Sequence, residues 1–146
     1  MVEKFLSAVP EITSELLYFS KYSSSLLEFR TKSVQLSPLT SITPVENCII
    51  AFSLIPNVMS KALDHKAPSI DRRIKAIKTL ADKGWKIGLR FDPLIHGNNW
   101  QNHYEKLFFE IFSSLPRSAI HSVTYGALRF PRSMFRKVFK LYPDEP

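Results

Sequence analysis

The sequence has 146 residues, with 20 Lys and Arg against 13 Asp and Glu, so its formal net charge is +7, and 45% of its residues are hydrophobic. This composition supplies a folded core, which excludes a disordered chain, and the length corresponds to one domain, residues 1–146, or part of one. No apolar run has the roughly 18 residues of a membrane span, and no signal peptide precedes the first helix, so we expect a cytoplasmic protein without a membrane partner. The single cysteine, Cys48, excludes an intrachain disulfide and an iron–sulfur cluster held by this sequence alone.

The first half of the sequence alternates helical and strand-like patterns. Apolar residues at helical spacing predict a helix from Pro10 to about Tyr22, and a short strand follows at Leu26–Arg30. Residues 34–46 contain two prolines and many Ser and Thr, which favours no more than a short helical turn. The nearly continuous apolar run Cys48–Leu54 predicts a strand that is buried on both faces, as in a parallel sheet.

The second half continues this alternation with clearer boundaries. Ser69 is a good N-cap for a helix, and Gly84 ends that helix in a left-handed conformation. The remaining predicted elements are a strand at Trp85–Phe91, a helix from Asn98 or Asn99 to Pro116, a strand at Ile120–Tyr125, and a last helix that opens at Pro131 and buries Met134, Phe135, Val138 and Leu141.

Strands that alternate with helices at this spacing predict βαβ units and a parallel sheet. A closed eight-unit barrel takes about 250 residues, and no glycine-rich dinucleotide-binding turn follows the first strand. The sequence therefore predicts an α/β fold, a partial (βα) barrel fragment of about four parallel strands.

Polar side chains follow the predicted strands at their carboxyl ends, where chemistry gathers in parallel α/β folds. Lys, Arg, Ser and Thr with one carboxylate suit an anionic or zwitterionic ligand. Two alternatives stay open, because Arg90 and Asp92 could instead pair with each other or with neighbouring strands, and Ser53 could be a small core residue. The candidates are Arg30, Thr31, Lys32 and Ser33 after the first strand, Ser53 at the end of the second, Arg90 and Asp92 at the third, and Thr124, Tyr125 and Arg129 around the fourth.

Two basic groups lie between regularly spaced apolar residues, which favours the solvated outer face of a helix over an anion site. They are Arg72, Arg73 and Lys75, and Arg132, Arg136, Lys137 and Lys140. The four histidines form no metal-ligand motif, and Cys48 begins a buried strand, so we predict no metal site and assign no catalytic residue.

Five segments carry a resemblance to a known family: LEFRTKS (Leu27–Ser33), AFSL (Ala51–Leu54), APSIDRRIKA (Ala67–Ala76), GWKIGLRFDPLI (Gly84–Ile95) and YGALRF (Tyr125–Phe130). In this order they resemble the second half of the spore photoproduct lyase family, which are radical S-adenosylmethionine proteins often labelled DNA repair photolyases. The resemblance extends from about Glu15 to Tyr142.

The resemblance implies a partial (βα) barrel with S-adenosylmethionine and a four-iron four-sulfur cluster at the carboxyl ends of its strands. Lys32 and Ser53 are similar to the family's S-adenosylmethionine contacts, and Arg129 to an arginine on the lesion side of the pocket. Arg90 and Asp92 are further candidates for substrate binding on their strand-end position and motif match. The family's CxxxCxxC loop belongs to the first half of its barrel, so we expect the cluster only in that half.

Three hypotheses follow. The chain is a truncated or split radical lyase for thymine-dimer lesions, inactive alone; a non-catalytic basic module that associates with DNA by charge; or a subunit that completes a barrel with a separately encoded first half. The first strand should have an open edge, which favours docking of that half or self-association.

Overall fold

A computed structural model describes residues 9–22, 24–129 and 131–143 of the chain. Its elements, in chain order, are helix α2 (Val9–Phe19), strand β1 (Leu27–Thr31), helix α3 (Ser37–Thr40), strand β2 (Cys48–Ser53), helix α4 (Asn57–Leu63), helix α5 (Ile70–Asp82), strand β3 (Lys86–Leu94), helix α6 (Trp100–Ser114), the 3₁₀ turn η1 (Arg117–Ala119), strand β4 (Ile120–Ala127) and helix α7 (Arg132–Leu141).

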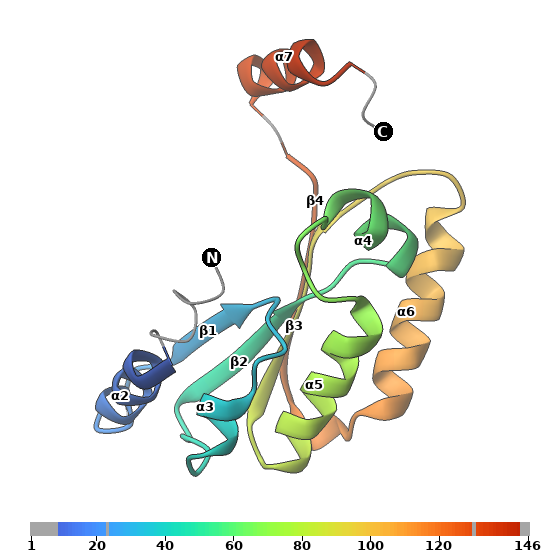
Figure 1. Ribbon diagram of the computed structural model, residues 1–146. Helices are drawn as coiled ribbons and strands as arrows, with labels where there is room; N and C mark the ends of the chain where they lie inside the picture. Colours follow the sequence, from blue (N-terminus) through green and yellow to red (C-terminus); the bar gives the residue numbers. More distant parts are fainter. Residues whose placement is uncertain (1–8, 23, 130, 144–146) are drawn as a thin grey trace.

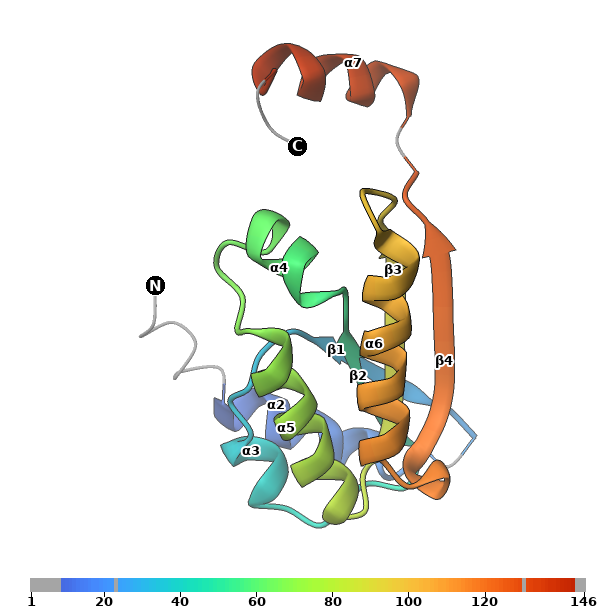
Figure 2. The same cartoon turned by 90° about the vertical axis from the view of Figure 1, so that its right-hand side faces the viewer.

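The four strands form one sheet in the order β1-β2-β3-β4, and every neighbouring pair is parallel. Helices α3, α5 and α6 lie on one side of this sheet (Figures 1 and 2). The predicted fold class, a partial (βα) barrel fragment of four parallel strands, is therefore confirmed.

The two faces of the sheet differ in polarity because side chains alternate along each strand. The face toward the helices is apolar and belongs to the core, as Ile50 and Phe52 of β2 and Leu89 and Phe91 of β3 show. The opposite face, here called the polar face, carries small and polar residues in neighbouring register: Glu28 and Arg30, Ala51 and Ser53, Gly88 and Arg90, and Ser122 and Thr124.

Helix α5 begins and ends as its sequence predicts. The Ser69 hydroxyl accepts a hydrogen bond from the backbone N–H of Arg72, and Gly84 adopts a φ of 99°. The N–H of Trp85 then donates to the carbonyl of Leu80, so the helix closes with a Schellman-type turn. This turn places the buried Trp85 indole under α3, where its Nε1 donates to the carbonyl of Leu39 at 3.0 Å.

Two parts of the described chain differ from the predicted elements. Helix α4 follows β2 where no element was predicted, because its seven residues are too few to show a helical apolar pattern. The predicted burial of Met134, Phe135, Val138 and Leu141 is wrong. The chain leaves β4 along the strand direction, so α7 stands beyond the carboxyl edge of the sheet and is exposed throughout (Figure 2).

No helix among the described residues is both long and apolar enough to cross a membrane.

Gly88, on the polar face, has no room for a side chain. A Cβ atom added to it would lie 2.8 Å from Nη2 of Arg90 and 2.9 Å from Cβ of Ala51. The guanidinium group of Arg90 thus folds back over the glycine, and the small residue beside it on β2 leaves the remaining space. A larger side chain at Gly88 has to displace either this guanidinium or a neighbouring strand.

We expect Gly88→Ala to lower the free energy of unfolding by about 1–3 kcal/mol, the usual cost of overpacking a filled site. Gly97→Ala is the matched control, because an added Cβ there meets nothing within 4 Å. Urea unfolding of both variants measures the difference. Equal stabilities of the two variants would show that the Arg90 guanidinium does not occupy the space above Gly88.

Candidate functional site

The polar residues predicted from the sequence gather at the carboxyl edge of the sheet. Lys32 directly follows β1, Ser53 is the last residue of β2, Asp92 lies near the end of β3, and Arg129 follows β4. Because the strands are parallel and in register, their carboxyl ends share one edge. This edge is the candidate site.

The turn after β1 presents Lys32 in a fixed way. The Thr31 hydroxyl accepts a hydrogen bond from the N–H of Ser33 at 2.8 Å, and the Ser33 hydroxyl accepts one from the N–H of Gln35 at 3.1 Å. Such side-chain bonds replace the strand ladder as the chain turns away from the sheet. Thr31 and Ser33 therefore order the loop, while the Lys32 side chain remains partly exposed.

The ammonium group of Lys32 is held by a carboxylate from the segment between α4 and α5. Lys32 Nζ donates to Oδ1 of Asp64 at 2.5 Å, and Oδ2 of the same carboxylate accepts from Nη2 of Arg73 at 2.9 Å. A lysine has three N–H donors, so within the described ranges two donors of Lys32 have no protein partner and could bind a ligand. The three residues form a chain of alternating charge that runs from the exposed edge into the core.

Arg73 is buried, with no exposed side-chain surface, so the predicted solvated face is wrong for this residue although Arg72 and Lys75 are exposed. Its Nε donates to the carbonyl of Pro68 at 2.9 Å, and its Nη1 donates to the carbonyl of Ser53 at 3.0 Å. Side chains on a helix lean toward its N-terminus, which carries this guanidinium to the end of β2. The helical spacing contained a signal for this burial, because position 73 lies three residues after Ile70 and four before Ile77, but the basic side chain was assigned to the solvated face.

The two cations determine the ionisation of Asp64. Partial burial by itself raises the pKa of this carboxyl, but the hydrogen bonds from Lys32 and Arg73 and their positive charges outweigh burial and hold the pKa below its usual range. Asp64 is therefore a carboxylate throughout the neutral range. It was absent from the sequence-predicted site because it lies in a loop outside the strand ends.

Ser53 differs from its neighbours in β2 because it is only half-buried. Its backbone carbonyl is bound by Arg73, but in the described part of the chain its hydroxyl has no hydrogen-bond partner. The hydroxyl lies on the polar face, in register with Arg90. Ser53 is thus available to a ligand near Lys32.

Arg90 lies deeper in the sheet and is almost fully buried. Its Nε and Nη2 bind the two carboxylate oxygens of Glu28 at 3.0 and 2.5 Å, and its other bonds reach Ser122 and the carbonyl of Leu89. These bonds use all five N–H donors of the guanidinium. A ligand can bind Arg90 only if one of these hydrogen bonds breaks. Of the alternatives considered from the sequence, the structure shows Arg90 paired with other strands of the sheet.

Asp92 and Arg129 form a separate pair of positions around Gly126. A Cβ atom added to Gly126 would lie 3.3 Å from Oδ1 of Asp92 and 3.7 Å from Nη2 of Arg129. The carboxylate and the guanidinium therefore converge over the end of β4, and both residues are exposed. These two charges are accessible to a ligand.

Cys48 and the histidines provide no metal site among the described residues. Burial raises the pKa of the Cys48 thiol to about 11, so the thiolate that binds iron is disfavoured. No group of three or more His, Cys, Asp or Glu side chains in the described ranges is arranged to hold a metal ion.

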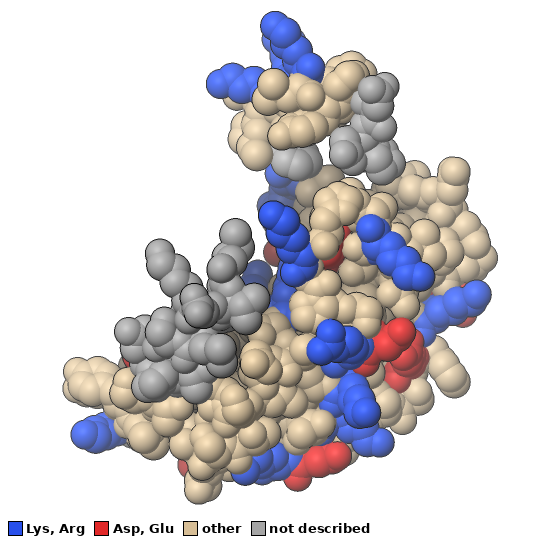
Figure 3. All heavy atoms as spheres, in the orientation of Figure 1, with Lys and Arg blue, Asp and Glu red and all other residues tan. Residues whose placement is uncertain are grey.

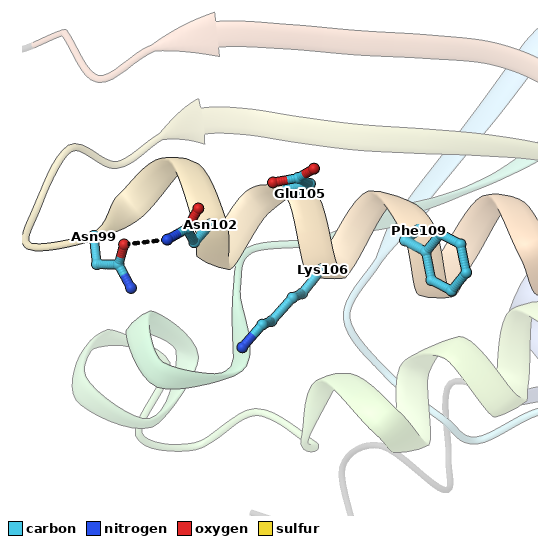
Figure 4. Close-up of a pocket in the computed structure, with 5 residues that line it drawn as sticks. All are labelled: Asn99, Asn102, Glu105, Lys106 and Phe109. Atoms are coloured by element: carbon cyan, nitrogen blue, oxygen red, sulfur yellow. Dashed lines mark hydrogen bonds between the residues drawn. The ribbon is translucent and has the colours of Figure 1, made fainter.

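Two surface features lie outside the strand-end cluster. A shallow groove of about 450 Å³ follows α6 and is lined by Asn99, Asn102, Glu105, Lys106 and Phe109, all from this helix or the residue before it (Figure 4). Helix α7 contains Arg132, Arg136, Lys137 and Lys140 and no acidic residue. Positive side chains are visible at the top of Figure 3, where this helix lies. Neither feature contains Lys32, Ser53, Asp64 or Arg73.

The strand-end edge thus offers one ammonium, one free hydroxyl and a carboxylate–guanidinium pair, on a half-barrel of parallel strands. Such a set binds the charged groups of a zwitterionic or anionic ligand. The fold and this edge define an α/β domain, an open four-stranded parallel half-barrel with its polar residues at the carboxyl ends of the strands.

The comparisons with known proteins identify the family. The sequence profile of the family described as spore photoproduct lyase matches residues 7–145, so the chain belongs to the spore photoproduct lyase family. The lyase of Clostridium acetobutylicum is 25% identical over 143 residues, and that of Bacillus subtilis is 24% identical over 128 residues. These matches cover 98% and 86% of this chain.

Solved structures show the same fold. A spore photoproduct lyase variant with bound AdoMet and dinucleoside spore photoproduct superposes with a TM-score of 0.78 at 20% identity, covering 92% of this chain and 40% of that chain. Another, a complex with dinucleoside spore photoproduct, has a TM-score of 0.77. This chain spans 41% and 37% of the length of the two curated relatives.

The ion pair between Glu28 and Arg90 predicts a pH dependence of stability. Hydrogen bonds from Arg90 hold the pKa of Glu28 below its ordinary value of 4.5, against the opposing effect of partial burial. Because the folded-state pKa is lower than the unfolded one, this contribution is fully present above the unfolded value and is lost as pH falls through the folded value.

Glu28→Gln should therefore lower stability at neutral pH and flatten its dependence on pH between roughly 5 and 3. The exposed Glu46→Gln is the control and should leave the slope as in the wild type. Urea unfolding at a series of pH values provides the comparison. If the Glu28→Gln curve ran parallel to the wild type, the Arg90 pair would not contribute to acid sensitivity.

Proposed function

We propose that this chain forms the S-adenosylmethionine-facing and substrate-facing part of a radical lyase for thymine-dimer lesions in DNA. Its 146 residues correspond to a single domain, the C-terminal half of such a barrel, and do not carry out the reaction alone. The observation that carries the proposal is the arrangement of Lys32 and Ser53 at adjacent strand ends. Asp64 holds the Lys32 ammonium, Arg73 binds the backbone carbonyl of Ser53, and Arg73 and Asp64 bind each other.

The donor set fits S-adenosylmethionine. The two unused N–H groups of Lys32 suit the carboxylate of its methionine part, and the Ser53 hydroxyl can donate to or accept from a neighbouring polar atom. Asp92 and Arg129 lie at the same edge, beyond Arg90 in the sheet, and suit a polar substrate. We assign the first pair to the cofactor and the second pair to the lesion.

An iron–sulfur cluster does not fit this chain. The family's cluster needs several thiolates, whereas this sequence has one cysteine, and that cysteine is buried in β2 with a raised pKa. A cluster-bearing first half from another polypeptide, or from a further part of a longer chain, must supply it. Among the described residues, β1 is an edge strand of the sheet, and this edge is where such a half would add strands.

In this assembly, S-adenosylmethionine supplies the radical once an external cluster provides an electron. The residues of this chain bind and orient the cofactor. Lys32 holds its carboxylate end by a charge-assisted hydrogen bond, and the Ser53 hydroxyl restricts the position of the cofactor at the end of β2. Asp92 and Arg129 present opposite charges to the substrate. None of these groups needs to transfer a proton for the binding step.

The basic surface of α7 favours a second candidate function. Four cations without an acidic residue on one exposed amphipathic helix would attract DNA phosphates without any base contact. The chain would then be a non-catalytic DNA-binding module. Salt dependence separates the two functions, because a charge-only module loses all binding as salt rises.

The first test is reconstitution of the purified chain with iron and sulfide under anaerobic conditions. We expect no stable four-iron cluster, because one buried cysteine cannot ligate it. Absorbance and electron paramagnetic resonance measure cluster content, and Cys48→Ala should give the same background. A cluster signal that depends on Cys48 would contradict the proposal.

The second test uses the chain co-expressed with the cluster-bearing first half of a family member. Lys32→Ala should weaken S-adenosylmethionine binding by about 1–3 kcal/mol, the scale of a charge-assisted hydrogen bond. Arg136→Ala on the exposed α7 removes the same charge and should change binding little. Calorimetry at two salt concentrations is the measurement, and equal losses from both variants would assign binding to bulk electrostatics.

A further inference from the structure

One buried side chain contacts both halves of the proposed cofactor site. Arg73 binds the backbone carbonyl of Ser53 through Nη1 at 3.0 Å, and binds Asp64 through Nη2 at 2.9 Å. Asp64 in turn holds the ammonium group of Lys32. A single planar group thus connects the end of β2 with the side chain that follows β1.

Packing of the core does not by itself explain why an arginine is buried at position 73. Its side chain has no exposed surface, and Asp64 is only 11% exposed, whereas Lys32 is 46% exposed. Charged groups are rarely buried unless they are paired, and an apolar residue would fill the same volume without the cost of desolvation. The network leads outward, from a fixed buried charge to a lysine with two unused donors.

We propose that Arg73 is the positioning residue of this site, and that it acts through Asp64 to hold Lys32 in the orientation that meets the carboxylate of the cofactor. Arg73 does not touch the ligand. Its fixed fork holds the strand end and the carboxylate at once, which a lysine could not do because its ammonium is a single point of charge. The inference rests on the proposed function for the role of Lys32, but the contacts themselves do not.

The direct test observes Lys32 without requiring a ligand. In a chain labelled with ¹⁵N-lysine, the ammonium signal of Lys32 is identified by its loss in Lys32→Arg and followed by nuclear magnetic resonance. Ion pairing slows exchange of ammonium protons and restricts the group, so we expect a resolved signal in the wild type. Asp64→Asn, which keeps the shape of the side chain and removes its charge, should shift or broaden this signal.

Arg73 is tested by two variants and a matched control. Arg73→Gln should shift or broaden the Lys32 signal, and Arg73→Lys should do so to a smaller extent. Arg72→Gln removes the same charge from the adjacent exposed position of α5 and should leave the signal unchanged. The amide spectrum of each variant reports whether it is folded, and if Arg73→Gln does not fold, then Asp64→Asn and Arg73→Lys decide.

An unchanged Lys32 signal in folded Arg73→Lys and Asp64→Asn overturns the inference. In the co-expressed complex, Arg73→Lys should also weaken S-adenosylmethionine binding about 3- to 10-fold, with Arg72→Lys unaffected. If the signal responds to Arg73 while Lys32→Ala leaves cofactor binding intact, the proposed function fails and the positioning network stands. If Lys32→Ala abolishes binding while the signal ignores both partners, the proposed function stands and the network fails.

Discussion

The guanidinium group of Arg90 connects the two edge strands of the sheet. It binds Glu28 on β1 in a bidentate manner and Ser122 on β4, although it originates on β3. Backbone ladders join only neighbouring strands, so this group supplies a connection across β2 that the ladders lack. It requires a glycine at position 88, because a Cβ atom there would lie 2.8 Å from Nη2 of Arg90. The arrangement of the polar face therefore depends on one glycine and one fully bonded cation.

A second set of carboxylate–cation pairs lies at the carboxyl edge, but there one cation is not fully bonded. Arg90 uses all its donors within the sheet, whereas the chain that begins at Arg73 ends on Lys32, which keeps two donors for a ligand. Both carboxylates, Glu28 and Asp64, have pKa values below their usual range because cations bind them. A cation that is fully bonded within the fold thus differs from one that could accept a ligand in how many of its donors remain unused. Residue type and position along a strand do not specify this number.

Much of the fold could be predicted from the sequence because its signals are local. The alternation of apolar runs, the Ser69 cap and the glycine at position 84 each specify backbone conformation within a few residues. The positions of Lys32 and Ser53 at strand ends followed directly from these boundaries. The exposure of α7 could not be predicted, because an amphipathic pattern shows that a helix has an apolar face but not what covers it.

The contact between Arg73 and Asp64 could not be predicted from local sequence patterns. Position 73 lies three residues after Ile70 and four before Ile77, so helical periodicity places it on the buried face of α5, but it does not show which groups pair with the charge. These partners are the carbonyls of Pro68 and Ser53 and a carboxylate nine residues earlier in a loop. A buried arginine requires such partners, since an unpaired charge in the core would be prohibitive. A basic residue at a position within an apolar helical stripe, one turn after the N-cap, is therefore a candidate for reaching the adjacent strand end. Such a residue should be left out of the count of surface cations when that count is used to argue for DNA binding.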